Sequence, residues 1–282
     1  MTRRRALEER RDSLAEIRDI LDSMKTLAYM ETRKLTRFLD AQHAVVQGIE
    51  AAALDLLDFY PGLLPRPHSP SALCLLVGSE RGFCGDFNHA LLDYLESTTH
   101  AHPAGGPLLI AIGRKLRTLL EHDARVVAML DGASVVEEVT AVINRAVDEF
   151  AAVQEKHGGP SLACLYHSGQ NDLVMQPLLP PFQGLVHRAT RYSHPPVLNR
   201  PPGEVLIDLT DHYLPAALHR MLYTSLLVEN RQRVAHLEGA VQHLDDQSAE
   251  LVRQGNALRQ EEIIEELEMI LLNTSGDTTP LC

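Results

Sequence analysis

The residues best placed to do chemistry lie in the glycine-rich turn GSERGFCGDFN, residues 78–88. The turn follows a short apolar run and precedes a run with helical spacing, which predicts a strand, a turn and a helix in that order. The N–H groups that open such a helix can bind phosphate or another anion. The turn lacks the Gly-Lys-Ser/Thr ending of a P-loop, and Gly78, Gly82 and Gly85 do not have the spacing of a dinucleotide fingerprint. Two interpretations stay open, a structural turn and a ligand-binding loop.

Other candidate reactive side chains give weaker signals. Cys84, within the turn, could act as a nucleophile near His89, but catalysis needs a positioned base and an orienting group, which the sequence does not identify. The 14 histidines are scattered, and pairs seven apart, such as His212 and His219, indicate helix residues rather than metal ligands. We therefore expect no catalytic residue and no metal on this chain.

Composition narrows the class of protein. The chain has 282 residues, of which 45% are apolar, 23% charged and 5% aromatic, with no Trp, and this favours long helices over an all-β fold. A net charge of −12 argues against general nucleic-acid binding. The four cysteines have no CxxC spacing, so we expect reduced thiols. The N-terminus has no apolar signal core, and no run reaches the ~18–20 apolar residues of a membrane span. We expect a soluble protein, or one that reaches a membrane only through partners.

The first 60 residues are predicted to form one long helix. From Arg3 to Tyr60 there is no Pro and one Gly, and apolar residues recur every seven positions, which is coiled-coil spacing. One row contains Leu7, Leu14, Leu21, Ala28 and Leu35, and a second contains Ile17, Met24, Phe38, Val45, Ala52 and Phe59. Pro and Gly within residues 61–70 end the helix.

A second long helix is predicted at residues 209–273. The stretch from Ala216 to Asn273 has no Pro, and Pro215 is compatible with a first helical turn. Rows at sevenfold spacing contain Leu214, Met221, Val228 and Ala235, then Leu237, Leu244, Leu251 and Leu258, and the stripe continues to Leu271. The helix at residues 1–60 and this helix are predicted to pair antiparallel. In the alternative, each packs on another partner.

Charge is unevenly distributed between the two predicted helices. Residues 1–37 hold ten Lys/Arg and seven Asp/Glu, whereas residues 226–270 hold four Arg and ten Asp/Glu, so the two ends are complementary. The glutamates between 261 and 268 fit a solvated helix face. Arg231, Arg233 and Arg259 could instead meet acidic surfaces of a partner.

The middle of the chain, residues 71–205, alternates short apolar runs with helical patterns. The predicted strands are residues 72–77, 107–112, 125–130, 161–167 and 173–179, and the predicted helices are 87–97, 114–121 and 135–156. This alternation predicts a mainly parallel sheet. The predicted fold class is α/β: a long antiparallel two-helix coiled coil formed by the N- and C-terminal helices, with a central Rossmann-like α/β domain.

Several segments, in the same order along the chain, resemble the gamma subunit of F-type ATP synthases. The turn is similar to the family's Ser/Thr-Asp-Arg-Gly-Leu-Cys-Gly-x-x-Asn signature, and the matching residues are Arg81, Gly82, Cys84, Gly85 and Asn88. Met24-Lys25-Thr26-Leu27-Ala28 is similar to the family's Met-Lys-Met-Val-Ala, and residues 229–234 to its Glu-x-x-x-Arg-Met run. The family pattern Asn-x-x-Arg-Gln-x-x-Ile-x-x-Glu is matched by Asn256, Arg259, Gln260, Ile263 and Glu266. Glu80, Glu261 and Glu262 depart from the family pattern, which indicates a divergent bacterial form.

The resemblance implies a non-catalytic rotor subunit, the central stalk that couples ion flow to ATP synthesis or hydrolysis. Its implied partners are the alpha, beta and epsilon subunits and the membrane c-ring, at the cytoplasmic face of the bacterial cell membrane. Nucleotide, Mg²⁺ and the transported ion would bind other subunits, so the resemblance implies no cofactor on this chain. Met24, Lys25, Arg259 and Gln260 resemble contacts with the alpha/beta head. The alternative is a phosphate- or nucleotide-binding α/β domain with coiled-coil dimerisation arms.

Overall fold

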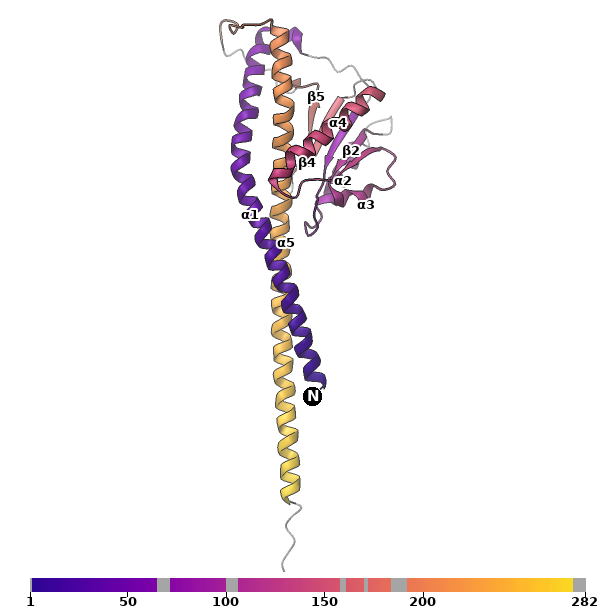
Figure 1. The fold of residues 1–282 in the computed structure, drawn as a ribbon, viewed down its shortest axis with the longest axis vertical. Coiled ribbons are helices and arrows are strands. Elements are labelled where there is room, and N and C mark those ends of the chain that lie inside the picture. Colours follow the sequence, from indigo (N-terminus) through magenta and orange to yellow (C-terminus); the bar gives the residue numbers. More distant parts are fainter. Residues whose placement is uncertain are drawn as a thin grey trace, which may run out of the picture. The chain divides into compact units, whose positions relative to one another are not determined.

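The computed structural model describes residues 2–64, 72–99, 106–157, 161–169, 172–183 and 192–275 (Figure 1). The chain divides into two compact units. The smaller unit contains Met1–Leu27 and Ala235–Cys282, and the larger contains Ala28–Val234. Each unit contains part of both long helices, because helix α1 spans Thr2–Phe59 and helix α5 spans Pro202–Ser275.

Helix α5 begins earlier than the sequence patterns predict. Pro215 lies inside it, so the interpretation of Pro215 as a first-turn residue is wrong. Pro202 instead occupies the first turn, where its missing N–H costs nothing, and Glu204 follows with a charge that suits the positive end of the helix dipole. A proline inside a helix weakens the helix but does not always end it, particularly where the helix is held by packing.

The two long helices run antiparallel within each unit. In the smaller unit, Arg18 Nε on α1 lies 2.9 Å from Asp245 Oδ1 on α5, so one complementary charge pair joins the helices. In the larger unit, Gln42 Nε2 donates to the carbonyl of Ala216 at 3.1 Å, and the rings of Phe38 and Tyr223 lie 6.1 Å apart. In both units the residue number rises along α1 as it falls along α5, which confirms the predicted direction of pairing.

The heptad rows are only partly buried. In the larger unit, Ala28 and Leu35 of the first row are buried, whereas Phe38 and Val45 of the second row are about half exposed. The buried stripe of α1 continues through Leu39, Val46, Ala53 and Leu56 instead. Leu39, Val46 and Ala53 are seven residues apart and lie one position after the second predicted row, while Leu56 continues the first row. The buried face of α1 thus keeps heptad spacing, but its second row is shifted by one residue from the predicted one.

Among the described residues, the central sheet has five strands in the order β3-β2-β1-β4-β5. The strands are β1 (Ala72–Val77), β2 (Leu108–Ile112), β3 (Val126–Leu130), β4 (Ser161–His167) and β5 (Leu173–Leu179). Strand β1 is parallel to β2 and β4, and β2 is parallel to β3. Strand β5 joins the edge antiparallel to β4 after a short connection, the geometry that a tight turn permits.

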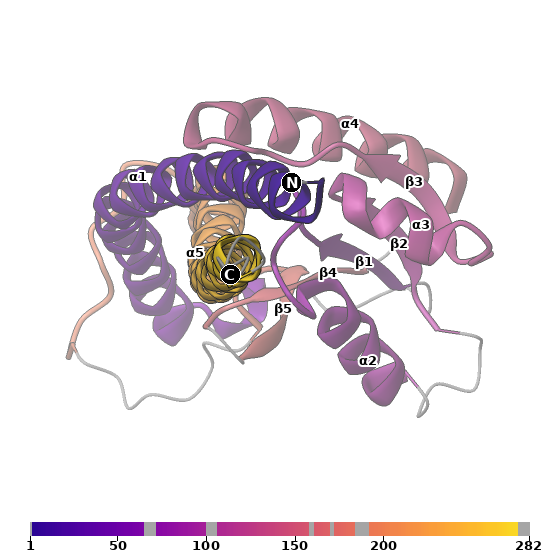
Figure 2. The ribbon, with the colours of Figure 1, turned by 90° about the horizontal axis from the view of Figure 1, so that it is seen from below.

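Helices cover both faces of the sheet. The helices between the strands are α2 (Phe87–Thr99), the short η2 and α3 (Arg114–Leu116 and Arg117–Leu120), and η3 and α4 (Val136–Glu138 and Val139–His157). Side chains of α2, η2 and α3 pack on one face, over Cys74 and Leu76. Helix α4 and the long helices of the larger unit pack on the other, over Leu73 and Leu75. Figure 2 shows α2 and α4 on opposite sides of the sheet. This three-layer arrangement confirms the predicted α/β fold class.

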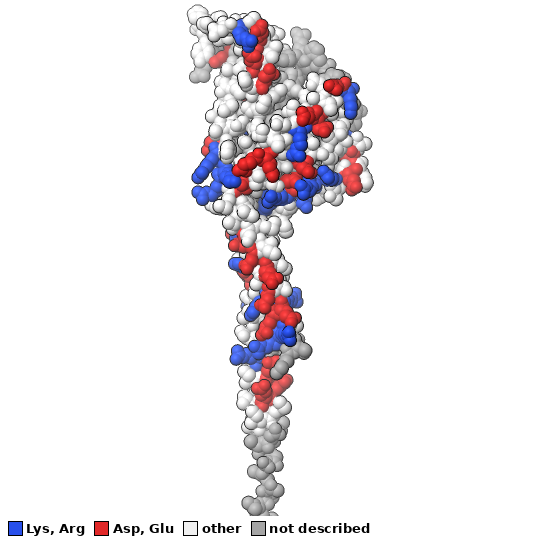
Figure 3. Space-filling model, viewed as in Figure 1, with Lys and Arg blue, Asp and Glu red and all other residues white. Residues whose placement is uncertain are grey.

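Within the described residues, no helix combines the length and the apolar character needed to cross a bilayer. On the face drawn in Figure 3, acidic and basic side chains alternate over the larger unit rather than forming a patch of one sign.

Candidate functional site

The 78–88 turn occupies the place in the sheet where α/β proteins usually bind ligands. It leaves the carboxyl end of β1, a strand that has β2 on one side and β4 on the other. The chain goes from β1 to a helix on one face, and it reaches β4 through a helix on the opposite face. Crevices at such switch points are the common ligand sites of open sheets. The groups that occupy this turn therefore distinguish a structural turn from a ligand-binding loop.

The first part of the turn is held by its own side chains. The Ser79 N–H donates to Asn88 Oδ1 at 2.9 Å, and Asn88 Nδ2 returns a bond to Ser79 Oγ at 2.8 Å. Asn88 lies in the first turn of α2, so this amide links the start of the turn to the helix that the turn opens. Gly78 is required because a Cβ there would lie 2.4 Å from Leu116 Cγ. The matching residue Asn88 therefore has a structural role in this fold.

The Glu80 carboxylate holds the turn to the neighbouring loops. Its Oε2 accepts from the N–H of Gly132 at 2.7 Å and the N–H of Arg114 at 3.0 Å, and its Oε1 pairs with the Arg114 guanidinium at 2.9 Å. The Glu80 side chain is buried, whereas the Arg114 guanidinium is 63% exposed. Arg114 and Gly132 follow β2 and β3, and the carboxylate thus ties together the carboxyl ends of three adjacent strands.

A second buried carboxylate reaches the turn from α5. The Glu229 side chain accepts from the N–H groups of Glu80 (3.4 Å) and Arg81 (3.2 Å), and it is paired with Arg233 one helical turn away. Glu229 and Arg233 are 3% and 4% exposed. Burial raises the pKa of the Glu229 carboxyl, while the Arg233 charge and the two N–H groups oppose that rise.

Arg233 also contacts the tip of the turn directly. Its Nε donates to the carbonyl of Gly82 at 3.0 Å, its Nη2 to Cys84 Sγ at 3.1 Å, and its Nη1 to Asn230 Oδ1 at 3.0 Å. The expectation that Arg233 meets an acidic partner surface is therefore wrong, because the guanidinium is buried and paired within the chain. A buried guanidinium needs several acceptors, and the turn supplies two of them.

These contacts favour the structural interpretation of the turn. In a phosphate-binding loop, backbone N–H groups face an anionic ligand. Here the N–H groups of Glu80 and Arg81 face the carboxylate of Glu229, so the chain supplies its own anion. Glu80 adds a second buried carboxylate to the same place, and like charges would repel a bound phosphate.

Cys84 has the environment of a structural thiol. It is buried, and its Sγ donates toward the carbonyls of Arg81 and Gly82. Burial raises the pKa of the Cys84 thiol to about 12, with the Glu229 charge as a further cause. The nucleophile is the thiolate, so a thiol with this pKa is unreactive at neutral pH. Of the remaining matching residues, Gly85 adopts a left-handed φ of 62° and Arg81 is exposed, with its Nε bonded to Ser134 Oγ.

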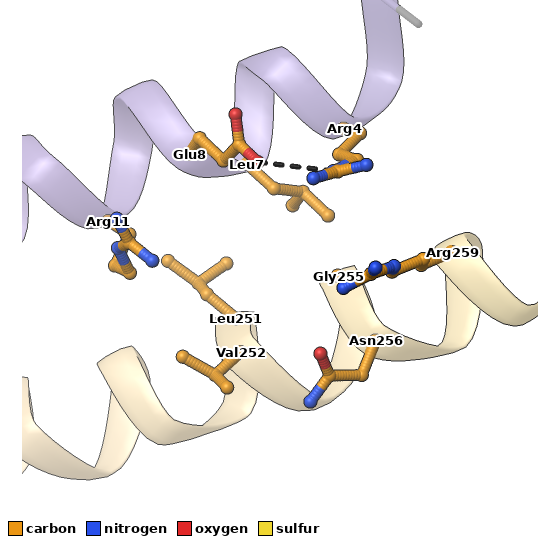
Figure 4. Close-up of a pocket in the computed structure, with 9 residues that line it drawn as sticks. All are labelled: Arg4, Leu7, Glu8, Arg11, Leu251, Val252, Gly255, Asn256 and Arg259. Carbon is orange, nitrogen blue, oxygen red and sulfur yellow. Dashed lines mark hydrogen bonds and ion pairs between the residues drawn. The ribbon is translucent and has the colours of Figure 1, made fainter.

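The other predicted contact residues lie in the smaller unit. Arg259 borders a groove of about 110 Å³ between α1 and α5 (Figure 4). The groove is lined by Arg4, Leu7, Glu8, Arg11, Leu251, Val252, Gly255, Asn256 and Arg259. Arg4 pairs with Glu8 and Arg11 with Asp12, whereas Arg259 forms no ion pair or side-chain hydrogen bond with any described residue.

The structure does not bring the four predicted head contacts together. Met24 and Lys25 lie on α1, as expected, but Arg259 faces the region of Arg4 on that helix. Twenty residues of helix separate Arg4 from Met24, on the order of 30 Å. Lys25 pairs with Asp22 at 2.9 Å, and Gln260 is exposed outside the groove. Sequence matching missed Arg4 and Arg11, which become candidates only through the antiparallel register.

Within the described residues, no group of three or more His, Cys, Asp or Glu side chains is arranged to hold a metal ion. In this α/β layer domain, the turn at the switch point is filled by the carboxylate of Glu229, which favours a structural turn over a nucleotide-binding site.

The comparisons with known proteins identify the family. The ATP synthase family model matches residues 3–272, and the chain belongs to the gamma family of ATP synthases. The gamma chain of Clostridium perfringens strain SM101 is 22% identical over 94% of this chain and 95% of its own length. That of Syntrophobacter fumaroxidans is 26% identical over 82% and 80%.

Solved structures show the same fold. A chain of the Euglena gracilis mitochondrial ATP synthase, in the cryo-EM structure of OSCP, F1 and the c-ring, aligns with a TM-score of 0.62 and 13% identity. The alignment covers 99% of this chain and 97% of that chain. A chain from the rotor structure of the same enzyme aligns with a TM-score of 0.58 over 93% and 99%, also at 13% identity.

Proposed function

We propose that this chain is the central-stalk gamma subunit of an F-type ATP synthase. In this function it rotates within the alpha/beta head and couples ion flow through the membrane sector to ATP synthesis or hydrolysis. The observation that carries the proposal is the family match over residues 3–272, on a chain whose two long helices pair antiparallel. The subunit itself is non-catalytic, and nucleotide chemistry belongs to the beta subunits.

In this proposal, three segments of the chain have different functions. Residues 1–60 and 209–273 form the two helices of the coiled-coil shaft. Residues 71–205 form the α/β domain, which is called the foot below. Two mutually packed helices resist bending and twisting better than one, which a shaft requires. The foot would contact the epsilon subunit and the c-ring, and the far end of the shaft would enter the ring of alpha and beta subunits.

The exposed end of α5 supports a contact with the head. Ile263, Ile264, Leu267, Met269, Ile270 and Leu271 are all about half exposed or more. A run of large apolar side chains in water is typical of a surface that a partner covers. Met24, Lys25, Arg259 and Gln260 are the proposed head contacts, and the groove beside Arg259 would receive a carboxylate of an alpha or beta subunit. Arg4 and Arg11 would add positive charge to the same contact.

The complex, rather than this chain, would provide the attachment to the membrane. We place the subunit at the cytoplasmic face of the bacterial cell membrane, held there by the c-ring. Rotation of the shaft would present different faces to three catalytic sites in turn, and this is how a rigid element couples distant sites.

Co-purification tests the assignment. A tagged chain is co-expressed with the alpha and beta subunits of its own operon, and the isolated chain is titrated with ATP and with phosphate by calorimetry. We expect a stable complex with alpha and beta and no micromolar affinity for either ligand. A homodimer that excludes alpha and beta and binds nucleotide would instead establish a ligand-binding domain with dimerisation arms, and the proposal would be wrong.

A further inference from the structure

We propose that Glu229 and Arg233 are positioning residues that lock the 78–88 turn to α5, so that the α/β domain and α5 rotate as one body. The inference rests on the proposed function for its consequence, but its structural part is independent of that function. Both side chains are buried, and together they contact the turn at four points, the N–H groups of Glu80 and Arg81, the carbonyl of Gly82 and the Cys84 sulfur.

Most of the remaining contact between α5 and the α/β domain is apolar. Two further hydrogen bonds lie away from the turn, one between Thr140 Oγ1 and His219 Nε2 at 3.2 Å and one from Arg220 Nη2 to Gln176 Oε1 at 3.3 Å. Leu218, Leu222 and Leu226 of α5 belong to the large apolar cluster that also contains the sheet residues Leu73 and Leu75. Apolar burial is non-directional and depends on area, so it resists separation better than it resists small rotations or slides. Hydrogen bonds weaken steeply with misalignment, and the four contacts of the Glu229–Arg233 pair therefore fix one register between the turn and the helix.

The pair also holds the turn in a conformation that it would not adopt alone. Phe83 has a φ of 62°, a left-handed value that is rare for a bulky residue, and it is 46% exposed. Arg233 bonds to both neighbours of Phe83, the carbonyl of Gly82 before it and the sulfur of Cys84 after it. A strained residue persists only where its surroundings over-determine its conformation. The Arg233 guanidinium supplies that restraint, since it forms hydrogen bonds with the residues on each side of Phe83.

Water cannot easily replace these contacts. Glu80, Cys84, Glu229 and Arg233 are all less than 10% exposed. The adjoining cavity, beside Gly78, Ser225 and Glu229, has a volume of only about 20 Å³, room for about one water molecule. If the pair is disrupted, the N–H groups of Glu80 and Arg81 lose their acceptor, and the turn must move to recover one.

A charge swap distinguishes the contacts of the pair with the turn from the ion pair between Glu229 and Arg233. Glu229→Arg with Arg233→Glu keeps an i,i+4 pair within α5 but places a guanidinium, which cannot accept a hydrogen bond, opposite the two N–H groups. Arg233→Lys is the second variant, because it keeps the charge beside Glu229 but not the fork that reaches both Gly82 and Cys84. Glu204→Gln is the control, since it removes an exposed carboxylate from the first turn of α5, with its ion pair to Arg200 just before the helix.

Hydrogen exchange measures the structural part of the inference. We expect the exchange of the Glu80 and Arg81 amides to accelerate in the charge swap by on the order of tenfold or more, because a bond to a charged acceptor is lost. In the charge swap, the amides of β1 should exchange as in the wild type. In the Glu204→Gln control, the amides of the turn should also exchange as in the wild type. For Arg233→Lys, loosening of the Cys84 end of the turn should speed exchange at Phe87, whose N–H donates to the carbonyl of Cys84 at 3.4 Å, with Glu80 and Arg81 still protected. Unchanged exchange throughout the turn in both variants would overturn the inference.

Ion pumping by the assembled complex measures the consequence. In vesicles containing the complex, the charge swap and Arg233→Lys should each lower the number of ions pumped per ATP hydrolysed, while Glu204→Gln should not. A ratio equal to that of the wild type in both variants, despite faster exchange in the turn, would show that the lock does not transmit rotation, and only this inference would fail. If the wild-type chain supports no ATP-driven pumping in a complete complex, the proposed function fails instead.

Discussion

The substitution Arg233→Met tests the energetics of the buried pair in most detail. It removes the guanidinium but keeps a side chain of similar length, so Glu229 loses its counter-charge while the helix is little changed. Breaking a buried pair by removing one partner costs about 3–5 kcal/mol, because the remaining charge is left unpaired. At about 2–4 °C per kcal/mol for a chain of this size, the melting temperature should fall by roughly 6–20 °C.

The comparison with an exposed pair sets the scale. Arg253 pairs with Glu250 at 2.7 Å on the same helix, but the two side chains are 72% and 52% exposed. Arg253→Met should cost about 0–1 kcal/mol, as exposed ion pairs do. Urea unfolding followed by circular dichroism measures both variants against the wild type. An Arg233→Met variant that unfolds within about 1 kcal/mol of the wild type would refute the reasoning, because it falls below the range for a buried pair.

The pH dependence of the same variant gives a second check on the cause. Burial already raises the pKa of Glu229, and Arg233 opposes that rise, so removing Arg233 should raise the pKa further. A carboxyl with a raised folded-state pKa binds a proton more readily in the folded state, so stability increases as the pH falls. The destabilisation caused by Arg233→Met should therefore shrink as the pH falls from 7 toward the ordinary Glu range. A destabilisation that is constant with pH would show that lost packing, not the unpaired charge, is responsible.

Three further substitutions test other parts of the account. Changing Arg259 and Gln260 together to Ala should slow ATP hydrolysis by the assembled complex while the circular dichroism of the subunit stays the same, and wild-type turnover would remove these residues from the proposed contact. Gly78→Ala should destabilise the chain by about 1–3 kcal/mol, because the added Cβ would lie 2.4 Å from Leu116 Cγ, whereas the open helical position Gly48 should accept Ala without loss. His167 is buried with its Nε2 2.9 Å from the Phe87 carbonyl and its Nδ1 unbonded among the described residues, and burial lowers its pKa below 6.5. Its stability contribution is thus complete above about pH 6.5 and declines as the pH falls below it, so His167→Gln should flatten the loss of stability between pH 7 and 5, and an equally steep loss would contradict this.

The regular elements could be predicted well from the sequence because their signals are local. The strands at 72–77, 161–167 and 173–179 have the predicted bounds, since each is a mostly apolar run bounded by turn residues. The start of α5 was predicted too late, because Pro215 resembled a start signal and the true one, at Pro202, followed a Pro-rich stretch. Tertiary packing determines where α5 starts, and a local sequence pattern does not show that packing.

The contents of the candidate sites were harder to predict. Glu229 and Arg81 are 148 residues apart in the sequence. Neither local pattern indicates that the Glu229 carboxylate accepts a hydrogen bond inside the turn that contains Arg81. The sequence groups Arg233 with Arg231 and Arg259 as residues that could meet an acidic partner, because charged side chains are mostly exposed. Arg4 and Arg11 needed the antiparallel register of the helices before they could be placed beside Arg259. Long-range pairing, rather than residue type, determines each of these positions.

A reversible cross-link tests most directly whether this chain rotates. Cys84 is unsuitable because it is buried with a pKa of about 12, and the neighbouring Glu80 is buried as well. The exposed residues Arg81, Phe83 and Lys115 are changed singly to Cys and paired with a Cys on a beta subunit whose Cα lies within about 7 Å. If the chain is a rotor, oxidation should abolish ATP hydrolysis in proportion to the cross-link formed, and a reductant should restore it. Complete cross-linking with undiminished hydrolysis would contradict the account and indicate a static scaffold.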